Sequence, residues 1–98
     1  MADKHVTGMT DREILALLGA RLRALRKARK LKAGEVAELA GLNRGTVHRA
    51  EKGDNPTLLT VVRLLRVYGE LARLEDFLAP PEISPMDWVR SRKGHDRG

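Results

Sequence analysis

The stretch GLNRGTVHRAEKG, residues 41–53, holds the side chains of this chain that are best suited to binding a polar, anionic partner. Read as a helix, it has a single valine, Val47, and an outer face that carries Arg44, Gly45, His48, Arg49 and Lys52. A guanidinium group presents a fork of N–H donors that matches the O6 and N7 acceptors of guanine. The pattern therefore predicts a helix that is held by its valine and binds a partner through its arginines.

The positive charge of the chain is concentrated around this stretch. The formal net charge is +6, and residues 21–52 contain ten Lys or Arg against Glu35, Glu38 and Glu51, whereas the rest of the chain has nine basic and ten acidic residues. Such a local excess favours a surface that binds a polyanion. Because single-stranded nucleic acid needs aromatic rings among the basic residues and all three aromatic residues lie outside this segment, double-stranded DNA is the expected partner.

The composition gives no support for an enzyme or a metalloprotein. The chain has no cysteine, its three histidines are scattered along the sequence, and no pair of carboxylates stands in a pocket-like context. We therefore expect no catalytic residue, no metal site and no cofactor. Neither a signal peptide nor an apolar run of about 18 residues is present, which predicts a cytoplasmic protein without a membrane partner.

The apolar periodicity predicts an all-α chain. Residues 1–9 read as a flexible arm, residues 10–79 as one domain, and residues 80–98 as an extended connector, a short helix and a basic tail. Caps and periodic leucines predict five helices in the domain, with Asn55 capping the fourth and Pro56 as its first helical residue. The expected ranges are 11–29, 33–40, 44–52, 56–68 and 70–78.

Ala37, Gly41 and Val47 have the spacing of a helix-turn-helix. A small residue allows the next helix to pass over it, a glycine makes the turn, and a valine fixes the second helix to the first. This arrangement exposes one face of the second helix to the major groove of DNA.

From Leu18 to Leu65 the chain resembles the Cro/C1-type (XRE-like) helix-turn-helix family of transcriptional regulators. The stretches that carry the resemblance are LGARLRALRKARKL, VAELAGL, TVHRAEKG and NPTLLTVVRLL. The resemblance implies a five-helix, lambda repressor-like DNA-binding domain, here with a short C-terminal helical extension, that works as a dimer on a two-fold symmetric operator. A glutamine common in the family is replaced by Lys32 and Ala33, so the alanine provides no phosphate anchor.

The resemblance also implies site residues. Base-reading positions fall on Arg44, Gly45, His48 and Arg49, and an ion pair is expected between Arg26 and Glu51, with their side chains within about 4 Å at the rim of the DNA interface. Phosphate contacts are expected from Arg26, Lys32, Asn43, Thr46, Lys52, Asn55 and Thr57. The surplus of apolar residues in the last two helices predicts a homodimer interface formed by Leu59, Tyr68, Leu71, Leu74, Phe77 and Leu78.

Three functions fit these features. The first is a sequence-specific repressor or autoregulator that reads a near-palindromic operator. The second is the DNA-binding antitoxin of a toxin–antitoxin pair, in which the C-terminal segment around Trp88 would hold the toxin; the preferred interpretation is that Trp88 packs on its own domain or its dimer mate. The third is a protein-bridging module that uses the same fold without reading bases.

Overall fold

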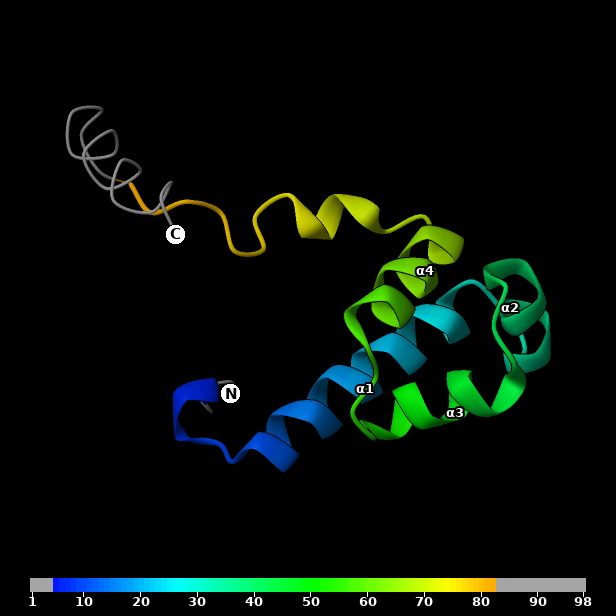
Figure 1. Cartoon of the computed structure of the whole chain (residues 1–98), viewed down its shortest axis with the longest axis horizontal. Helices are drawn as coiled ribbons and strands as arrows, with labels where there is room; N and C mark the ends of the chain where they lie inside the picture. Colours follow the sequence, from blue (N-terminus) through cyan, green and yellow to red (C-terminus); the bar gives the residue numbers. More distant parts are fainter. Residues whose placement is uncertain (1–4, 83–98) are drawn as a thin grey trace, which may run out of the picture.

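The computed structural model describes residues 5–82, and every regular element in that range is a helix (Figure 1). Four α-helices are preceded and followed by a short 3-10 helix. Their bounds are η1 Val6–Gly8, α1 Asp11–Ala28, α2 Ala33–Ala40, α3 Arg44–Lys52, α4 Leu58–Tyr68 and η2 Leu71–Leu74. The predicted short helix and basic tail, including Trp88, lie outside the described residues.

The helix ends of the central segment are those that the sequence predicts. The Asn43 side chain accepts a hydrogen bond from the Thr46 backbone N–H at 2.7 Å and thereby caps α3. Gly41 adopts the left-handed conformation, with φ 71°, in the turn between α2 and α3. These local devices fix the lengths of the two helices and bring α3 across α2.

Helix α4 begins later than predicted. Its N-cap is Thr57, whose hydroxyl accepts a hydrogen bond from the Thr60 backbone N–H at 3.0 Å. Asn55 instead has a positive φ of 47° and belongs to the preceding turn, and Pro56 precedes the cap. The prediction of Asn55 as the cap was wrong because asparagine serves equally well in a left-handed turn position.

The fifth α-helix predicted for residues 70–78 is not formed. Only the 3-10 helix η2 is present, and Leu78 has a positive φ of 61°. Leu71 and Leu74 pack against the core, whereas Phe77 and Leu78 are exposed. A short amphipathic segment gains helical stability mainly from burial of its apolar face, and half of this face has no partner within the domain.

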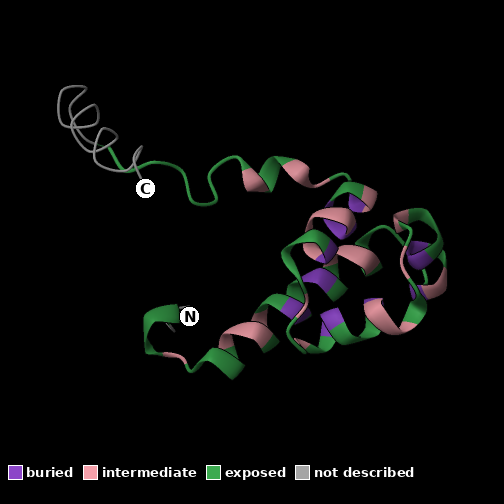
Figure 2. Cartoon of the chain, viewed as in Figure 1, coloured by how far each residue is buried: buried purple, intermediate pink, exposed green. Residues whose placement is uncertain are grey.

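The core lies where α1, α2, α3 and α4 face one another, as the buried residues in Figure 2 show. Val36, Val47 and Leu64 are fully buried, one from each of three helices. Tyr68 is only 1% exposed, so it belongs to this core and not to the dimer surface predicted for it. Because α3 packs against α1, α2 and α4, its orientation is fixed by three neighbours.

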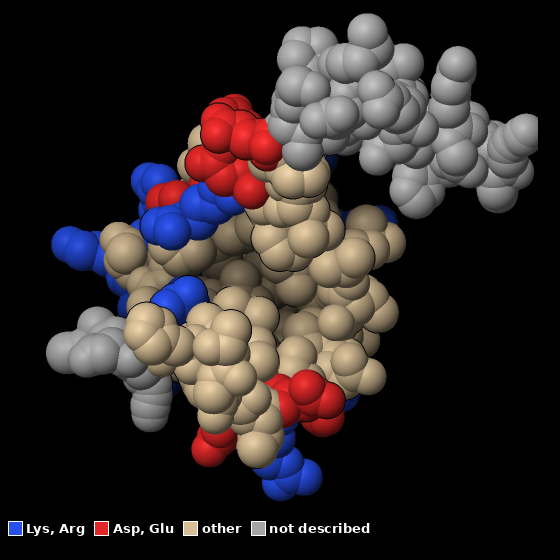
Figure 3. Space-filling view, turned by 90° about the vertical axis from the view of Figure 1, so that its left-hand side faces the viewer, with Lys and Arg blue, Asp and Glu red and all other residues tan. Residues whose placement is uncertain are grey.

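An apolar groove of about 820 Å³ runs between α1, α4 and the segment after α4. Figure 3 looks at this hollowed face, which consists mostly of uncharged residues with charged side chains towards its edges. Exposed members include Leu18, Leu58 and Phe77, with 46%, 70% and 55% of their surface accessible. None of the helices in residues 5–82 has the length and apolar character needed to span a membrane.

Candidate nucleic-acid interface

Helix α3 has one buried and one exposed face. Val47, Ala50 and Glu51 are at most 9% exposed and form the inner side. The predicted base-reading residues lie on the other side: Arg44, His48 and Arg49 are exposed and Gly45 is partly so. The structure therefore brings the four predicted residues together on one surface, and Lys52 extends that surface by one turn.

The first turn of α3 holds the Arg49 side chain in place. Its Nη2 donates a hydrogen bond to the Thr46 hydroxyl at 3.3 Å, and that hydroxyl donates to the Asn43 side-chain oxygen at 2.9 Å. The guanidinium lies against Gly45, where a Cβ would be 3.2 Å from Arg49 Nη1. Arg49 is thus directed towards the N-terminus of its helix.

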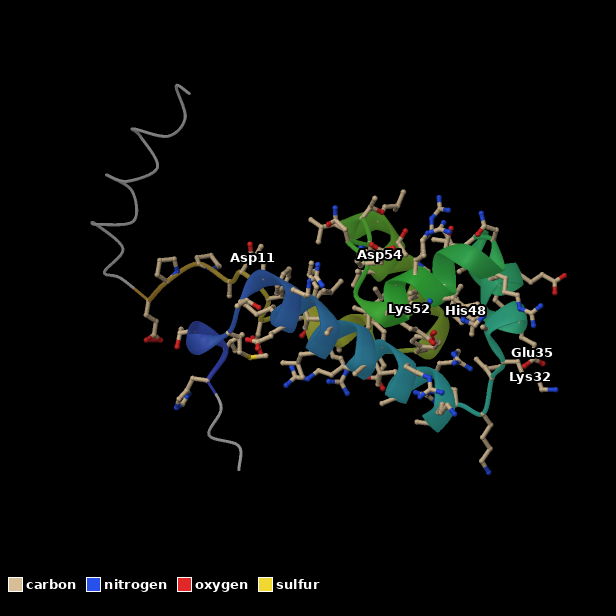
Figure 4. All side chains as sticks on the ribbon, turned by 90° about the horizontal axis from the view of Figure 1, so that it is seen from below. Asp11, Lys32, Glu35, His48, Lys52 and Asp54 are labelled. Atoms are coloured by element: carbon tan, nitrogen blue, oxygen red, sulfur yellow. The ribbon has the colours of Figure 1, made fainter. Side chains whose placement is uncertain are left out.

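Arg44 lies at the other edge of the same face. Its guanidinium is placed over Gly34 in the first turn of α2, where a Cβ would be 3.9 Å from Arg44 Cζ. Figure 4 looks at this side of the molecule, with His48 and Lys52 along α3 and Lys32 at the start of α2. Basic side chains of α3 and the N-cap residue of α2 therefore border one surface.

Arg26 and Glu51 form the expected ion pair. Arg26 Nε and Nη2 donate to the two carboxylate oxygens of Glu51 at 2.7 and 3.0 Å, and Nη1 donates to the Leu31 carbonyl oxygen at 3.0 Å. The side chains are 11% and 5% exposed, and the hydrogen bond to Glu51 raises the pKa of Arg26. Arg26 is therefore held inside the domain through all three nitrogens, whereas two of its five N–H donors have no partner among residues 5–82, and its phosphate contact stays a prediction.

Tyr68 lies beneath this ion pair. Burial, together with the negative charge of Glu51, raises the pKa of Tyr68 to about 12. The hydroxyl has no hydrogen-bond partner among residues 5–82. The base of α3 is therefore held to α1 by a charged pair, with a tyrosine kept neutral next to it.

The other predicted phosphate contacts lie on the surface around α3. Lys32, Asn43, Lys52, Asn55 and Thr57 are exposed, and Thr46 is partly exposed. Asn43 and Thr57 also cap helices, so their side-chain oxygens already accept backbone hydrogen bonds. Ala33, which stands where the family has a polar residue, is buried and belongs to the core.

Arg12 is a basic residue at the border of the candidate interface that the sequence did not predict. It lines a hollow with Lys52, Asp54 and Asn55, at the junction of α1 with the turn after α3. Nothing in the local sequence marks this arginine, because its position depends on how the first turns of α1 cross the end of α3. The basic border of the surface therefore includes a residue from the N-terminal half of α1.

Comparison with known proteins agrees with this geometry. A family model described as a helix-turn-helix domain matches residues 17–77, more than half of the 98 residues, which is consistent with the Cro/C1-type resemblance. No curated protein and no solved structure matches the chain. With α2, the turn at Gly41 and α3 all inside the matched region, the chain belongs to the helix-turn-helix domain family.

Proposed function

We propose that the chain is a sequence-specific, double-stranded DNA-binding regulator of transcription that represses its target, or its own gene, by occupying an operator. The observation that supports this most is the exposed face of α3, which carries Arg44, His48 and Arg49 on a helix fixed from behind by Val47. No reacting group is required for this function, since occupancy of the site is sufficient.

In this proposal α3 lies in the major groove. Arg44 and Arg49 donate to the O6 and N7 acceptors of guanine, and His48 reads an adjacent base edge. Lys32, Asn43, Lys52, Asn55 and Thr57 contact phosphates on either side and set the register of α3 along the duplex, whereas the hydroxyl proton of Thr46 is already donated to Asn43. Arg12 adds a further cation next to Lys52. Such phosphate contacts supply affinity, whereas the base contacts supply preference.

We propose further that two copies associate through the apolar face that includes the groove. Its support is the size of the groove and the exposure of Leu18, Leu58, Leu59, Phe77 and Leu78 in a domain whose core is already closed. Contiguous apolar surface of this kind is uncommon on a soluble monomer. A two-fold dimer would place two copies of α3 about 34 Å apart, one turn of DNA, on a near-palindromic site.

Selection from a random-sequence duplex library tests the proposed function. The purified chain is expected to enrich a near-palindrome whose half-site centres are about 10 base pairs apart. Binding should weaken steeply with salt, because each neutralised phosphate releases condensed counterions. A pool that stays random after repeated selection would contradict sequence-specific binding, and the chain would then fit the protein-bridging alternative better.

A further inference from the structure

The role of Gly45 is not explained by base reading, since glycine has no side chain that donates or accepts a hydrogen bond. It lies on the exposed face of α3, between Arg44 and Arg49, at one of the positions assigned to base readout. Glycine inside a helix also lowers helix stability relative to alanine. We therefore expect the atoms around its Cα to explain why a glycine stands in the first turn of α3.

The surroundings of Gly45 supply that reason. A Cβ at this position would be 3.2 Å from Arg49 Nη1 and 3.4 Å from the Asn43 side-chain oxygen. The first of these distances is shorter than an ordinary van der Waals contact, so the guanidinium would have to shift by a few tenths of an ångström. A methyl group on residue 45 would thus enter the space that Arg49 occupies next to the helix N-cap.

A directed set of hydrogen bonds reinforces this placement. Arg49 Nη2 donates to the Thr46 hydroxyl, which donates to the Asn43 side-chain oxygen, which also accepts from the Thr46 backbone N–H. A threonine hydroxyl has one proton and two lone pairs, so it can accept from the arginine while it donates to the asparagine. Arg49 spends one of the five N–H donors of a guanidinium on this contact and keeps the others for a ligand.

We propose that Gly45 and Thr46 are positioning residues for Arg49: the glycine leaves room for the guanidinium and the threonine hydroxyl sets its orientation before DNA binds. This inference rests on the proposed function, in which Arg49 reads a base. Preorganisation matters because a long arginine side chain otherwise loses rotamer freedom when it binds. Gly45 then sets specificity without touching a base.

The test compares base preference in Gly45→Ala, Thr46→Val, Arg49→Ala and wild-type chains. Each is titrated with the selected duplex and with its single-base-pair variants. Arg49→Ala is expected to reduce the preference at one base pair by about 5- to 150-fold. Gly45→Ala and Thr46→Val are expected to reduce the preference at that same base pair by a smaller factor. Thr46→Ser, which keeps the hydroxyl, should retain the wild-type preference. The salt dependence of binding by Gly45→Ala should equal that of the wild type. In the Arg49→Ala background, Gly45→Ala should have no further effect on preference.

Gly34→Ala is the matched control, because a Cβ there meets Arg44 at the ordinary contact distance of 3.9 Å. Gly34→Ala should leave the base preference that depends on Arg49 unchanged. The thermal unfolding midpoint of Gly45→Ala should be equal to or above that of the wild type, which would show that its change in preference does not come from unfolding. If Gly45→Ala weakens all duplexes alike, or adds its full effect to Arg49→Ala, the positioning role is wrong while base reading by Arg49 stands. If Arg49→Ala itself leaves every base preference intact, the inference and the base-reading role both fail.

Discussion

Gly19 of α1 lies directly against the backbone of Gly53, the residue that ends α3. A Cβ on Gly19 would be 2.7 Å from the Gly53 nitrogen and 2.5 Å from the Glu51 carbonyl oxygen. Conversely, a Cβ on Gly53 would meet the backbone of Leu15 and Ala16. The two glycines therefore let the scaffold helix and the candidate reading helix approach at backbone distance.

Gly19→Ala should destabilise the domain by at least about 2 kcal/mol, because the neighbouring atoms are backbone and cannot turn aside. Urea unfolding followed by circular dichroism measures the change in the free energy of unfolding. Gly34→Ala is the control, since its Cβ would make an ordinary contact and alanine favours helix, so its stability should equal or exceed that of the wild type. Equal stability of Gly19→Ala and wild type would show that α1 and α3 are not fixed at this distance.

Removing one partner of the Arg26–Glu51 pair should lower the free energy of unfolding more than replacing both partners with apolar residues. Glu51→Leu leaves the Arg26 guanidinium largely buried without its carboxylate, and such a loss typically costs about 3–5 kcal/mol. The double variant Arg26→Met/Glu51→Leu removes both charges and should be more stable than Glu51→Leu alone. Denaturant unfolding of the three chains makes the comparison. A double variant that is less stable than Glu51→Leu would mean that the pair stabilises the fold by more than charge compensation.

Tyr68 should make stability depend on alkaline pH. Its pKa rises from 10.0 to about 12 on folding, so its contribution is fully present below pH 10 and is lost as the pH rises through about 12. The loss is about 2–3 kcal/mol for a two-unit shift. Tyr68 is the only tyrosine of the chain, so the absorbance of tyrosinate reports this pKa directly.

Tyr68→Phe is the control for that titration. It should flatten the decline of stability between pH 10 and 12 and leave any decline that other groups cause. At neutral pH it should change stability little, since the hydroxyl lacks a hydrogen-bond partner among residues 5–82. A tyrosinate titration centred near pH 10 in the folded chain would contradict the buried position of the ring.

The proposed dimer should depend on Phe77 and not on apolar exposure in general. Phe77→Glu places a charge in the groove face and should weaken association by about 30-fold or more, the effect of losing a hot-spot residue. Leu39→Glu changes a leucine of α2 that is 67% exposed and lies outside the groove, and it should leave association unchanged. Sedimentation equilibrium measures both. A wild-type chain that is monomeric at micromolar concentration, free and on DNA, would contradict the dimer.

The parts of the fold that the sequence predicted are those set by local chemistry. The bounds of α2 and α3 follow from Gly41, Asn43 and Gly53, which act within one turn of the chain. The exposed basic face of α3 follows from periodicity alone. The Arg26–Glu51 contact was expected from the family resemblance, because the two residues are 25 positions apart and no local pattern links them.

The parts of the fold and of the candidate site that the sequence did not predict depend on packing between segments that are distant along the chain. The apolar pattern at residues 70–78 predicted a helix, yet Phe77 and Leu78 stay 55% and 83% exposed within the domain. The hydrogen bonds from Arg26 to Glu51 and to the Leu31 carbonyl oxygen depend on the path of the chain after α1. The roles of Gly19 and Gly45 likewise follow from atoms that approach them in space, and composition cannot reveal those neighbours.

The most direct test of the central claim, that the exposed face of α3 reads DNA sequence, is the ratio of affinities for the selected duplex and for a scrambled duplex of the same length and composition. Fluorescence anisotropy at fixed salt gives this ratio for the wild type, for Arg44→Ala/Arg49→Ala and for Arg66→Ala, a control that removes an exposed arginine of α4. The wild type and the control should prefer the selected duplex by at least about 1,000-fold. The double variant should lose most of that preference while it still binds scrambled DNA. Equal affinity of the wild type for both duplexes, or full preference in the double variant, would contradict the account.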